Sequence, residues 1–200
     1  MPVTALNVQI EESEMKKFPV TSVIGIAALA FIGIAPTAAS ATDLDSPEPT
    51  TIKVANVPGG FDRSIAAAHG YEIRTTPTGK QYSVKVGTPA GTVSTQSTGT
   101  VAGDCGYSFV TLSPGTHRMA SGFVVNGDVA FRKWGVTVQN GGIVYNFNMD
   151  GAASGASWSD YRAISWASGV TQATVNGGSF AALWNGQLCY SGIPHTTTVM

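Results

Sequence analysis

Two cysteines, Cys105 and Cys189, limit what this chain can fold into more than any other feature of its sequence. They are the only cysteines among 200 residues, and they enclose most of the segments in which apolar and polar residues alternate as in β-strands. Two cysteines in an exported chain are expected to pair, the alternative being two free thiols. The sequence therefore predicts a β domain closed by one disulfide.

Asn-Gly pairs inside this bracket indicate tight turns between antiparallel strands, because a two-residue hairpin turn needs positive φ at both central positions. From them we expect a three-stranded meander over residues 119–149 and a hairpin over 170–184. The predicted fold class is mostly β: an antiparallel β-sandwich or barrel of hairpins with one disulfide, plus one short N-terminal helix. The four pairs are Asn126-Gly127, Asn140-Gly141, Asn176-Gly177 and Asn185-Gly186.

The short helix is expected between Asp62 and Gly70. Asp62 can accept hydrogen bonds from the free N–H groups of the first turn, the alanines that follow favour helix, and Gly70 suits the left-handed position after the last turn. Residues 71–75 and 80–86 then alternate with a period of two around the turn Thr76-Pro77-Thr78-Gly79, which predicts a hairpin.

The start of the chain has the pattern of a secretory signal peptide. A basic start at Met15-Lys16-Lys17 precedes the apolar run 23–34 and an Ala-Ser-Ala site ending at Ala41. We expect Met15 to be the true start and cleavage to follow Ala41, which makes the protein secreted; the alternative is a membrane anchor. The expected division is signal peptide 1–41, exposed tail 42–60, helix and hairpin 61–87, Gly/Thr/Ser linker 88–103, disulfide-closed β domain 104–192 and tail 193–200.

Charge limits the classes of partner. Residues 42–200 carry nine basic and nine acidic side chains, and their polarity comes instead from Ser, Thr, Asn and Gly. Such a chain lacks the basic surface that binds nucleic acid or anionic lipid. We therefore expect no nucleic acid as partner and no stable membrane span after signal cleavage.

No motif predicts a catalytic residue. Gly103-Asp104-Cys105-Gly106 resembles the nucleophile loop of chymotrypsin-like proteases, but cysteine replaces serine, and a disulfide sulfur has no thiolate for attack. A hydrolase would need two placed carboxyl groups. After residue 41 there are only two glutamates, both expected outside the core domain, so loops would have to assemble a pair from aspartates.

No metal or cofactor is expected. Residues 146–151 resemble the start of a calcium loop, but the twelfth position holds Ser157 in place of a bidentate glutamate. Strand alternation explains the same spacing. His69, His117 and His195 are far apart and match no zinc-ligand spacing.

An aromatic cluster near the C-terminus is the most suggestive candidate site. Aromatic rings beside Asn, Asp and Arg can stack on the apolar faces of sugars, although tryptophans in strands also fill cores. We expect a non-enzymatic secreted binding module, with a cell-wall glycan or an extracellular protein as partner. The alternatives are a small secreted hydrolase and a proteinase inhibitor or antagonistic toxin presenting loop 150–157. The candidate ligand-binding residues are Trp158, Tyr161, Arg162, Trp166 and Trp184.

The layout resembles small, uncharacterised exported β-rich proteins of Gram-positive bacteria. The resemblance rests on the signal peptide and on short motifs, and it implies export without implying an activity. The chain also resembles an immunoglobulin domain loosely, since Trp134 lies between the cysteines, but Gln187 stands where a tyrosine corner needs Tyr. The short motifs are His69-Gly70-Tyr71, Tyr82-Ser83-Val84, Cys105-Gly106-Tyr107 and Leu188-Cys189-Tyr190-Ser191-Gly192.

Overall fold

The fold comes from a computed structural model that describes residues 48–91, 105–165 and 168–199, all within one compact unit, Thr42–Met200. The predicted signal peptide, most of the predicted linker and Trp166 lie outside the described residues. In the described part, no helix has the length and apolar character needed to span a membrane.

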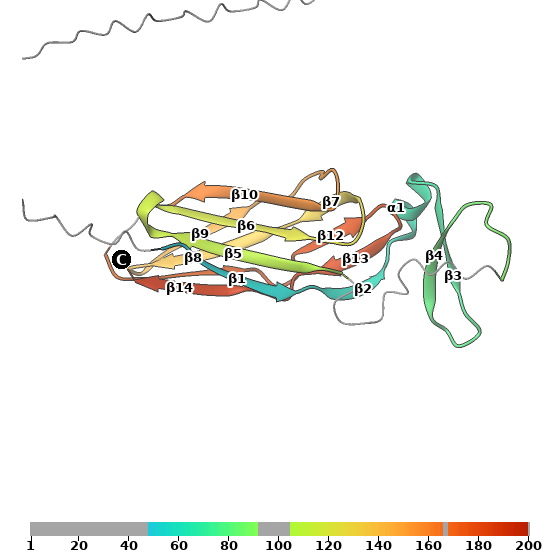
Figure 1. The fold of residues 1–200 in the computed structure, drawn as a ribbon, viewed down its shortest axis with the longest axis horizontal. Coiled ribbons are helices and arrows are strands. Elements are labelled where there is room, and N and C mark those ends of the chain that lie inside the picture. Colours follow the sequence, from blue (N-terminus) through green and yellow to red (C-terminus); the bar gives the residue numbers. More distant parts are fainter. Residues whose placement is uncertain (1–47, 92–104, 166–167, 200) are drawn as a thin grey trace, which may run out of the picture. The chain divides into compact units, whose positions relative to one another are not determined.

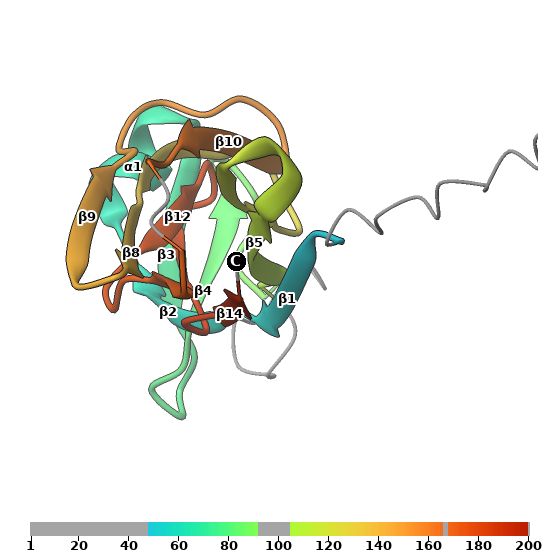
Figure 2. The ribbon, with the colours of Figure 1, turned by 90° about the vertical axis from the view of Figure 1, so that its left-hand side faces the viewer.

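The architecture is mostly antiparallel β with one disulfide, which confirms the predicted fold class. Looking nearly along the strands, Figure 2 shows β1 and β5 on one side and β8 and β9 on the opposite side. The first sheet is β1 (Thr50–Ala55), β5 (Tyr107–Ser113), β6 (Arg118–Val124) and β10 (Ser157–Ala163). The second sheet is β14 (His195–Val199), β11 (Val170–Val175), β8 (Gly135–Asn140) and β9 (Ile143–Asn148). The third sheet is β2 (Val57–Phe61), β13 (Gln187–Tyr190), β12 (Phe180–Leu183) and β7 (Val129–Lys133).

The third sheet continues the second in the direction of the strands, so that the two lie end to end (Figure 1). Strands β7 and β8 are separated only by Trp134, strands β11 and β12 by residues 176–179, and strands β13 and β14 by residues 191–194. Strand β1 belongs to the first sheet and β2 to the third, with Asn56 alone between them. One short segment therefore crosses from one layer to the other at Asn56.

The core lies between the first sheet on one side and the second and third sheets on the other, and it follows the period of two. Val110 and Leu112 of β5 and Val136 and Val138 of β8 point inward and are fully buried. Trp134, at the junction of β7 and β8, is 1% exposed. Its indole N–H donates to the Ser121 hydroxyl at 3.0 Å, so the largest buried ring keeps a hydrogen-bond partner.

The disulfide joins Cys105, just before β5, to Cys189 in β13. It ties the first sheet to the third beside the crossing, where the Asn56 side-chain amide donates to the Cys105 carbonyl at 3.0 Å. The sheets extend beyond the two cysteines, because β1 and β2 precede Cys105 and β14 follows Cys189.

Two of the four Asn-Gly pairs form hairpin turns. Asn140-Gly141 lies between the paired strands β8 and β9, and Asn185-Gly186 lies between β12 and β13. The predicted meander over 119–149 is wrong, because β6 pairs with β5 and β10 while β7 pairs with β12. The predicted hairpin over 170–184 is also wrong: residues 176–179 interrupt a single strand path that continues from the second sheet into the third.

The segments predicted as tails contain three strands. Residues 195–199 form β14 on the edge of the second sheet, and 50–55 and 57–61 form β1 and β2. Pro58 is compatible with a strand because β2 is an edge strand. Gly59 leaves room for the Tyr190 ring, since a Cβ there would lie 2.5 Å from Tyr190 Cε2.

Helix α1 (Arg63–Ala68) and the hairpin of β3 (Tyr71–Thr75) and β4 (Gln81–Lys85) lie at one end of the domain (Figure 1). Asp62 caps α1, accepting from the backbone N–H of Ser64 at 2.9 Å and of Ile65 at 3.1 Å. A short 3₁₀ turn, η1 (Pro114–Thr116), joins β5 to β6.

Candidate functional site

The predicted aromatic residues do not share one face. Trp158 and Arg162 point to the inner side of β10 and Tyr161 to its outer side. Trp158 is partly buried against the core, with the Arg132 guanidinium 4.2 Å from the centre of its ring. Arg162 is engaged in an ion pair of 2.6 Å with Asp160.

The remaining candidates lie apart from that strand. Tyr161 is 55% exposed, and the Arg118 guanidinium lies 4.5 Å from its ring centre. Trp184 follows β12 at the opposite end of the domain and stacks on His69, with 4.9 Å between ring centres. Of the five candidates, only Trp158 and Arg162 therefore lie on one face, and Trp166 is outside the described residues.

A different surface is hollowed and rich in hydrogen-bonding groups: the outer side of the second sheet, here called the polar face. Inward residues of its strands fill the core, so every second residue points outward. Within the described residues of this face, His195 is the one ionisable side chain. The face also holds the exposed valines Val144, Val170 and Val199, and its polar members are Thr137, Gln139, Asn146, Asn148, Gln172, Thr174, His195 and Thr197.

Gln139 and Gln172 form the middle of the polar face. They are directly opposite each other on the neighbouring strands β8 and β11, and both are exposed. Neither side-chain amide has a hydrogen-bond partner among the described residues. Each offers two N–H donors and a carbonyl acceptor. Side by side, they can bind vicinal hydroxyl groups that both donate and accept.

The next row along the strands is held in place by hydrogen bonds. The Thr174 hydroxyl lies 2.8 Å from Nδ1 of His195. The Thr137 hydroxyl lies 2.9 Å from the side chain of Asn146 and 2.7 Å from that of Asn176. A hydroxyl has one proton, so Thr137 donates to one amide and accepts from the other. This row is therefore ordered before any ligand arrives.

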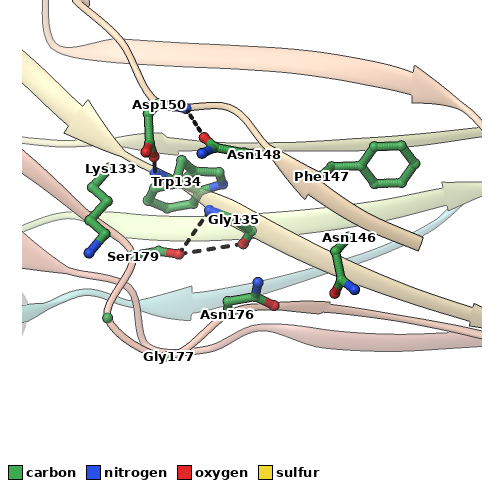
Figure 3. A pocket seen from close by; sticks show the side chains of 11 residues that line it. Lys133, Trp134, Gly135, Asn146, Phe147, Asn148, Asp150, Asn176, Gly177 and Ser179 are labelled. Atoms are coloured by element: carbon green, nitrogen blue, oxygen red, sulfur yellow. Dashed lines mark hydrogen bonds between the residues drawn. The ribbon is translucent and has the colours of Figure 1, made fainter. Parts of the chain in front are cut away.

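A hollow opens where the strands of the second and third sheets are interrupted (Figure 3). Strand β11 ends at Val175, so it offers no backbone carbonyl to the N–H of Gly135 at the start of β8. The Ser179 hydroxyl accepts from this N–H instead, at 3.1 Å. A Cβ on Gly135 would lie 2.8 Å from Asn176 Nδ2. Glycine at this position therefore lets the Asn176 amide lie close over the sheet.

Three depressions run along the polar face and share residues. The hollow of Figure 3 has a volume of about 300 Å³ and shares Asn176 and Gly177 with a second depression of about 460 Å³. The second shares Gln139 and Gln172 with a third of about 380 Å³. Together they form a shallow trough that crosses the face and could receive an extended ligand.

The ends of the trough differ in character. One end has Lys133 and Asp150, but an oxygen of Asp150 already accepts from the Trp134 backbone N–H at 2.6 Å. The other end is apolar, with the exposed residues Val144 and Val170. The segment resembling a calcium loop lies at the charged end, and its oxygens accept from protein groups: Asn148 Oδ1 accepts from Asp150 N–H at 2.9 Å.

Sequence reasoning missed the polar face because it followed the apolar side of each strand. The alternation that identified the core residues also determines which residues point outward. Over 137–139, 144–148 and 170–175 the outward residues are Thr, Gln and Asn, together with Val144 and Val170. The signal was therefore present in the sequence. Its concentration on one surface depends on β8, β9 and β11 being neighbours, which the sequence does not show.

Comparisons with protein-family models, with curated proteins and with solved structures find no match to this chain.

Proposed function

We propose that the protein is a secreted, non-enzymatic module that binds a neutral glycan on its polar face, with a cell-wall polysaccharide as the ligand class. The observation that carries the proposal is the pair of unpartnered amides of Gln139 and Gln172, which line the two depressions of the trough that contain no charged residue. Neutral donors and acceptors at a fixed spacing complement hydroxyl groups, which are themselves neutral donors and acceptors.

The scarcity of charge supports this reading. Exposed sheet faces usually contain Lys, Glu, Arg or Asp, which keep the protein soluble and discourage association between sheets. Here several exposed strand positions in succession hold amides and hydroxyls. A protein partner would favour aromatic, Met or Arg anchors in the interface core, and the described residues of the polar face include none of these.

The apolar margins add a second kind of contact. Ile193 is 50% exposed beside the middle depression, and Val144 is 53% exposed beside the depression at the apolar end. Each can contact the apolar C–H side of a sugar ring while the amides bind its hydroxyl groups. Export is part of the proposal: the disulfide is compatible with an oxidising compartment, and the signal-peptide pattern predicts secretion.

The two competing activities have less support. A hydrolase would need a free carboxyl pair, but Asp150 accepts from Trp134 and Asp160 is paired with Arg162. An inhibitor would present a rigid, protruding loop, and the loop after β9 is instead tied to β7, where Arg132 and Gly151 exchange backbone hydrogen bonds of 2.8 and 3.0 Å.

The test is a pull-down of the purified protein on insoluble neutral polysaccharides, purified cell walls and intact Gram-positive cells, followed by titration with soluble oligosaccharides. The double variant Gln139→Ala/Gln172→Ala removes both free amides. If each makes one hydrogen bond of about 0.5–1.5 kcal/mol, affinity falls roughly 5- to 150-fold. Both side chains are exposed, so the free energy of unfolding should change by less than about 1 kcal/mol.

Tyr161→Ala is the matched control, because Tyr161 is exposed on the opposite sheet. Its binding should equal that of the unsubstituted protein. Retention on glycan that is unchanged by the double variant but lost in Tyr161→Ala would reject the polar face and favour the outer side of β10. Absence of retention on every glycan and cell preparation would reject glycan binding altogether.

A further inference from the structure

A second cavity lies at the other end of the domain, where the β3–β4 hairpin meets the end of the third sheet. Its volume is about 110 Å³. An apolar cavity of about 150 Å³ can hold a benzene ring, so this one takes four or five non-hydrogen atoms and is too small for a sugar ring. It therefore serves a different ligand from the trough. The residues that define it here are Tyr71, Ser83, Asn126, Asp128, Trp184 and Asn185.

Ser83 gives the first sign that something binds there. It lies on β4, is 6% exposed, and its hydroxyl has no hydrogen-bond partner within the described parts of the chain. Leaving a buried hydroxyl unpaired is costly, and such groups in native structures usually have a partner of some kind. A donor placed in the cavity would supply that partner.

The charge of the cavity gives the second sign. Asp128 is its one charged residue, and among the described residues no cation pairs with this carboxylate. The Asn185 carbonyl oxygen is turned toward protein donors, accepting from Gln187 N–H at 3.0 Å, which leaves it a second lone pair. Asp128 is therefore the one full charge in a polar lining whose hydroxyl and amide groups can accept hydrogen bonds from a cation.

The walls of the cavity are aromatic. Tyr71 lines it from β3 and Trp184 from the turn after β12. The Trp184 ring is 41% exposed and stacks on His69, with an angle of 6° between the ring planes. This stacking fixes one side of the indole against the residue that ends α1. The arrangement combines a carboxylate, an unpaired hydroxyl and aromatic faces, which together favour a compact cation.

We infer that this cavity is a binding site for a primary ammonium group on a short aliphatic chain. The ammonium has three donors and no acceptor, so it can donate to a carboxylate, a hydroxyl and an amide oxygen at the same time. Asp128 supplies the opposite charge, Ser83 and Asn185 accept N–H groups, and Trp184 and Tyr71 contact the adjacent methylenes. Such a group can come from a free amine or from a lysine side chain on a peptide.

The experiment is a titration of the ¹⁵N-labelled protein, observed through the indole N–H resonance of Trp184, which the Trp184→Phe variant assigns. The probes are ethylammonium chloride and Nα-acetyl-lysinamide, and ethanol and sodium chloride are the blanks. We expect a saturable shift of this resonance with at least one ammonium probe and none with the blanks. Binding of ethylammonium alone identifies a free amine as the source, and binding of the lysine derivative shows that a peptide can supply it.

Three variants make the result decisive. Asp128→Asn keeps the shape of the side chain and should weaken binding at least tenfold. Glu48→Gln removes the same charge from the exposed segment before β1 and should leave binding within twofold. Ser83→Ala should raise the melting temperature of the free protein, because it removes an unpaired buried hydroxyl, and should weaken ammonium binding several-fold.

Ser83→Ala should therefore raise the melting temperature and lower the affinity for ammonium. A serine with a purely structural role would not produce both changes. Equal responses to ethylammonium and sodium chloride would overturn the inference, as would equal affinity in Asp128→Asn and Glu48→Gln. Gln139→Ala/Gln172→Ala should bind ammonium normally, so the two proposed sites succeed or fail separately.

Discussion

Arg132 offers a direct test of how the loop between β9 and β10 is held. Its side chain donates to the Met149 carbonyl through Nε at 2.9 Å and to the Ala152 carbonyl through the guanidinium, and it lies over the Trp158 ring. Burial lowers the pKa of the guanidinium, while Asp160 and Asp150 act in the opposite direction. The side chain thus links the loop to the core through a planar fork with several donors.

Arg132→Lys keeps the charge but removes the fork, so the ammonium can reach one carbonyl at most. The loss of one hydrogen bond from a charged donor costs about 1.5–3 kcal/mol. We expect the free energy of unfolding to fall by about 2 kcal/mol, which lowers Tm by roughly 4–8 °C in a domain of this size. The measurement is urea unfolding at equilibrium, together with hydrogen exchange of the loop amides.

Exchange should accelerate in residues 152–154, which follow the bond to Ala152, and not in the core strand β8. Lys133→Ala is the control, because Lys133 is the next residue and is exposed, so its cost should stay within about 0.5 kcal/mol. If Arg132→Lys matches this control in stability and in loop exchange, the reasoning is refuted. The backbone bonds between Arg132 and Gly151 would then suffice to hold the loop.

Three further predictions concern stability. Replacing Cys105 and Cys189 with alanine opens a link between residues 84 apart, and the chain-entropy model gives a loss of about 4–5 kcal/mol by urea unfolding; a loss below about 1 kcal/mol would contradict it. Ser121→Ala leaves the buried indole N–H of Trp134 without its acceptor and should cost about 1–3 kcal/mol, whereas the exposed Ser159→Ala on the neighbouring strand should cost almost nothing. Hydrogen bonds from the Ser64 hydroxyl and the Ile65 N–H lower the pKa of Asp62, so its capping contribution is complete above the unfolded-state pKa near 4 and is lost as pH falls through the lower folded pKa. Asp62→Ala should therefore destabilise the protein by about 1 kcal/mol at pH 7 and by less at pH 2.5, and an equal effect at both pH values would exclude the cap.

Local turn chemistry predicted hairpins correctly where strand partners are neighbours in sequence. Asn140-Gly141 and Asn185-Gly186 follow this rule. Asn126-Gly127 does not, because the strand before it belongs to the first sheet and the strand after it to the third. An Asn-Gly pair permits a sharp change of direction, but the distribution of core side chains between layers decides which strands pair.

The missed strands share a different cause. Residues 195–199 are His-Thr-Thr-Thr-Val, and with a single apolar residue they show no alternation of apolar and polar side chains. Threonine is nevertheless β-branched and suits strands. Thr196 points inward and is 2% exposed, beside the Thr50 carbonyl. Its burial depends on contact with β1, at the far end of the described chain, and no local window of sequence contains that information.

The sequence could not place the candidate aromatic residues relative to one another. Trp158 and Trp184, which were expected to share a binding face, lie on different parts of the domain. Trp158 packs against Phe123 and Trp134, with ring centres 5.7 and 6.0 Å away. Large rings are common both in cores and at interfaces, so composition alone could not separate the two roles.

The place of β14 has a consequence for how the domain can assemble. This strand pairs with β11, lies next to β1, and consists of the last residues that the structure describes. The second sheet therefore lacks this edge strand until residues 195–199 are available, and the contact of β14 with β1 joins segments far apart in the sequence, which makes folding slow. A chain that is threaded through a membrane before it folds must remain unfolded during transit. Slow formation of such distant contacts would favour that delay.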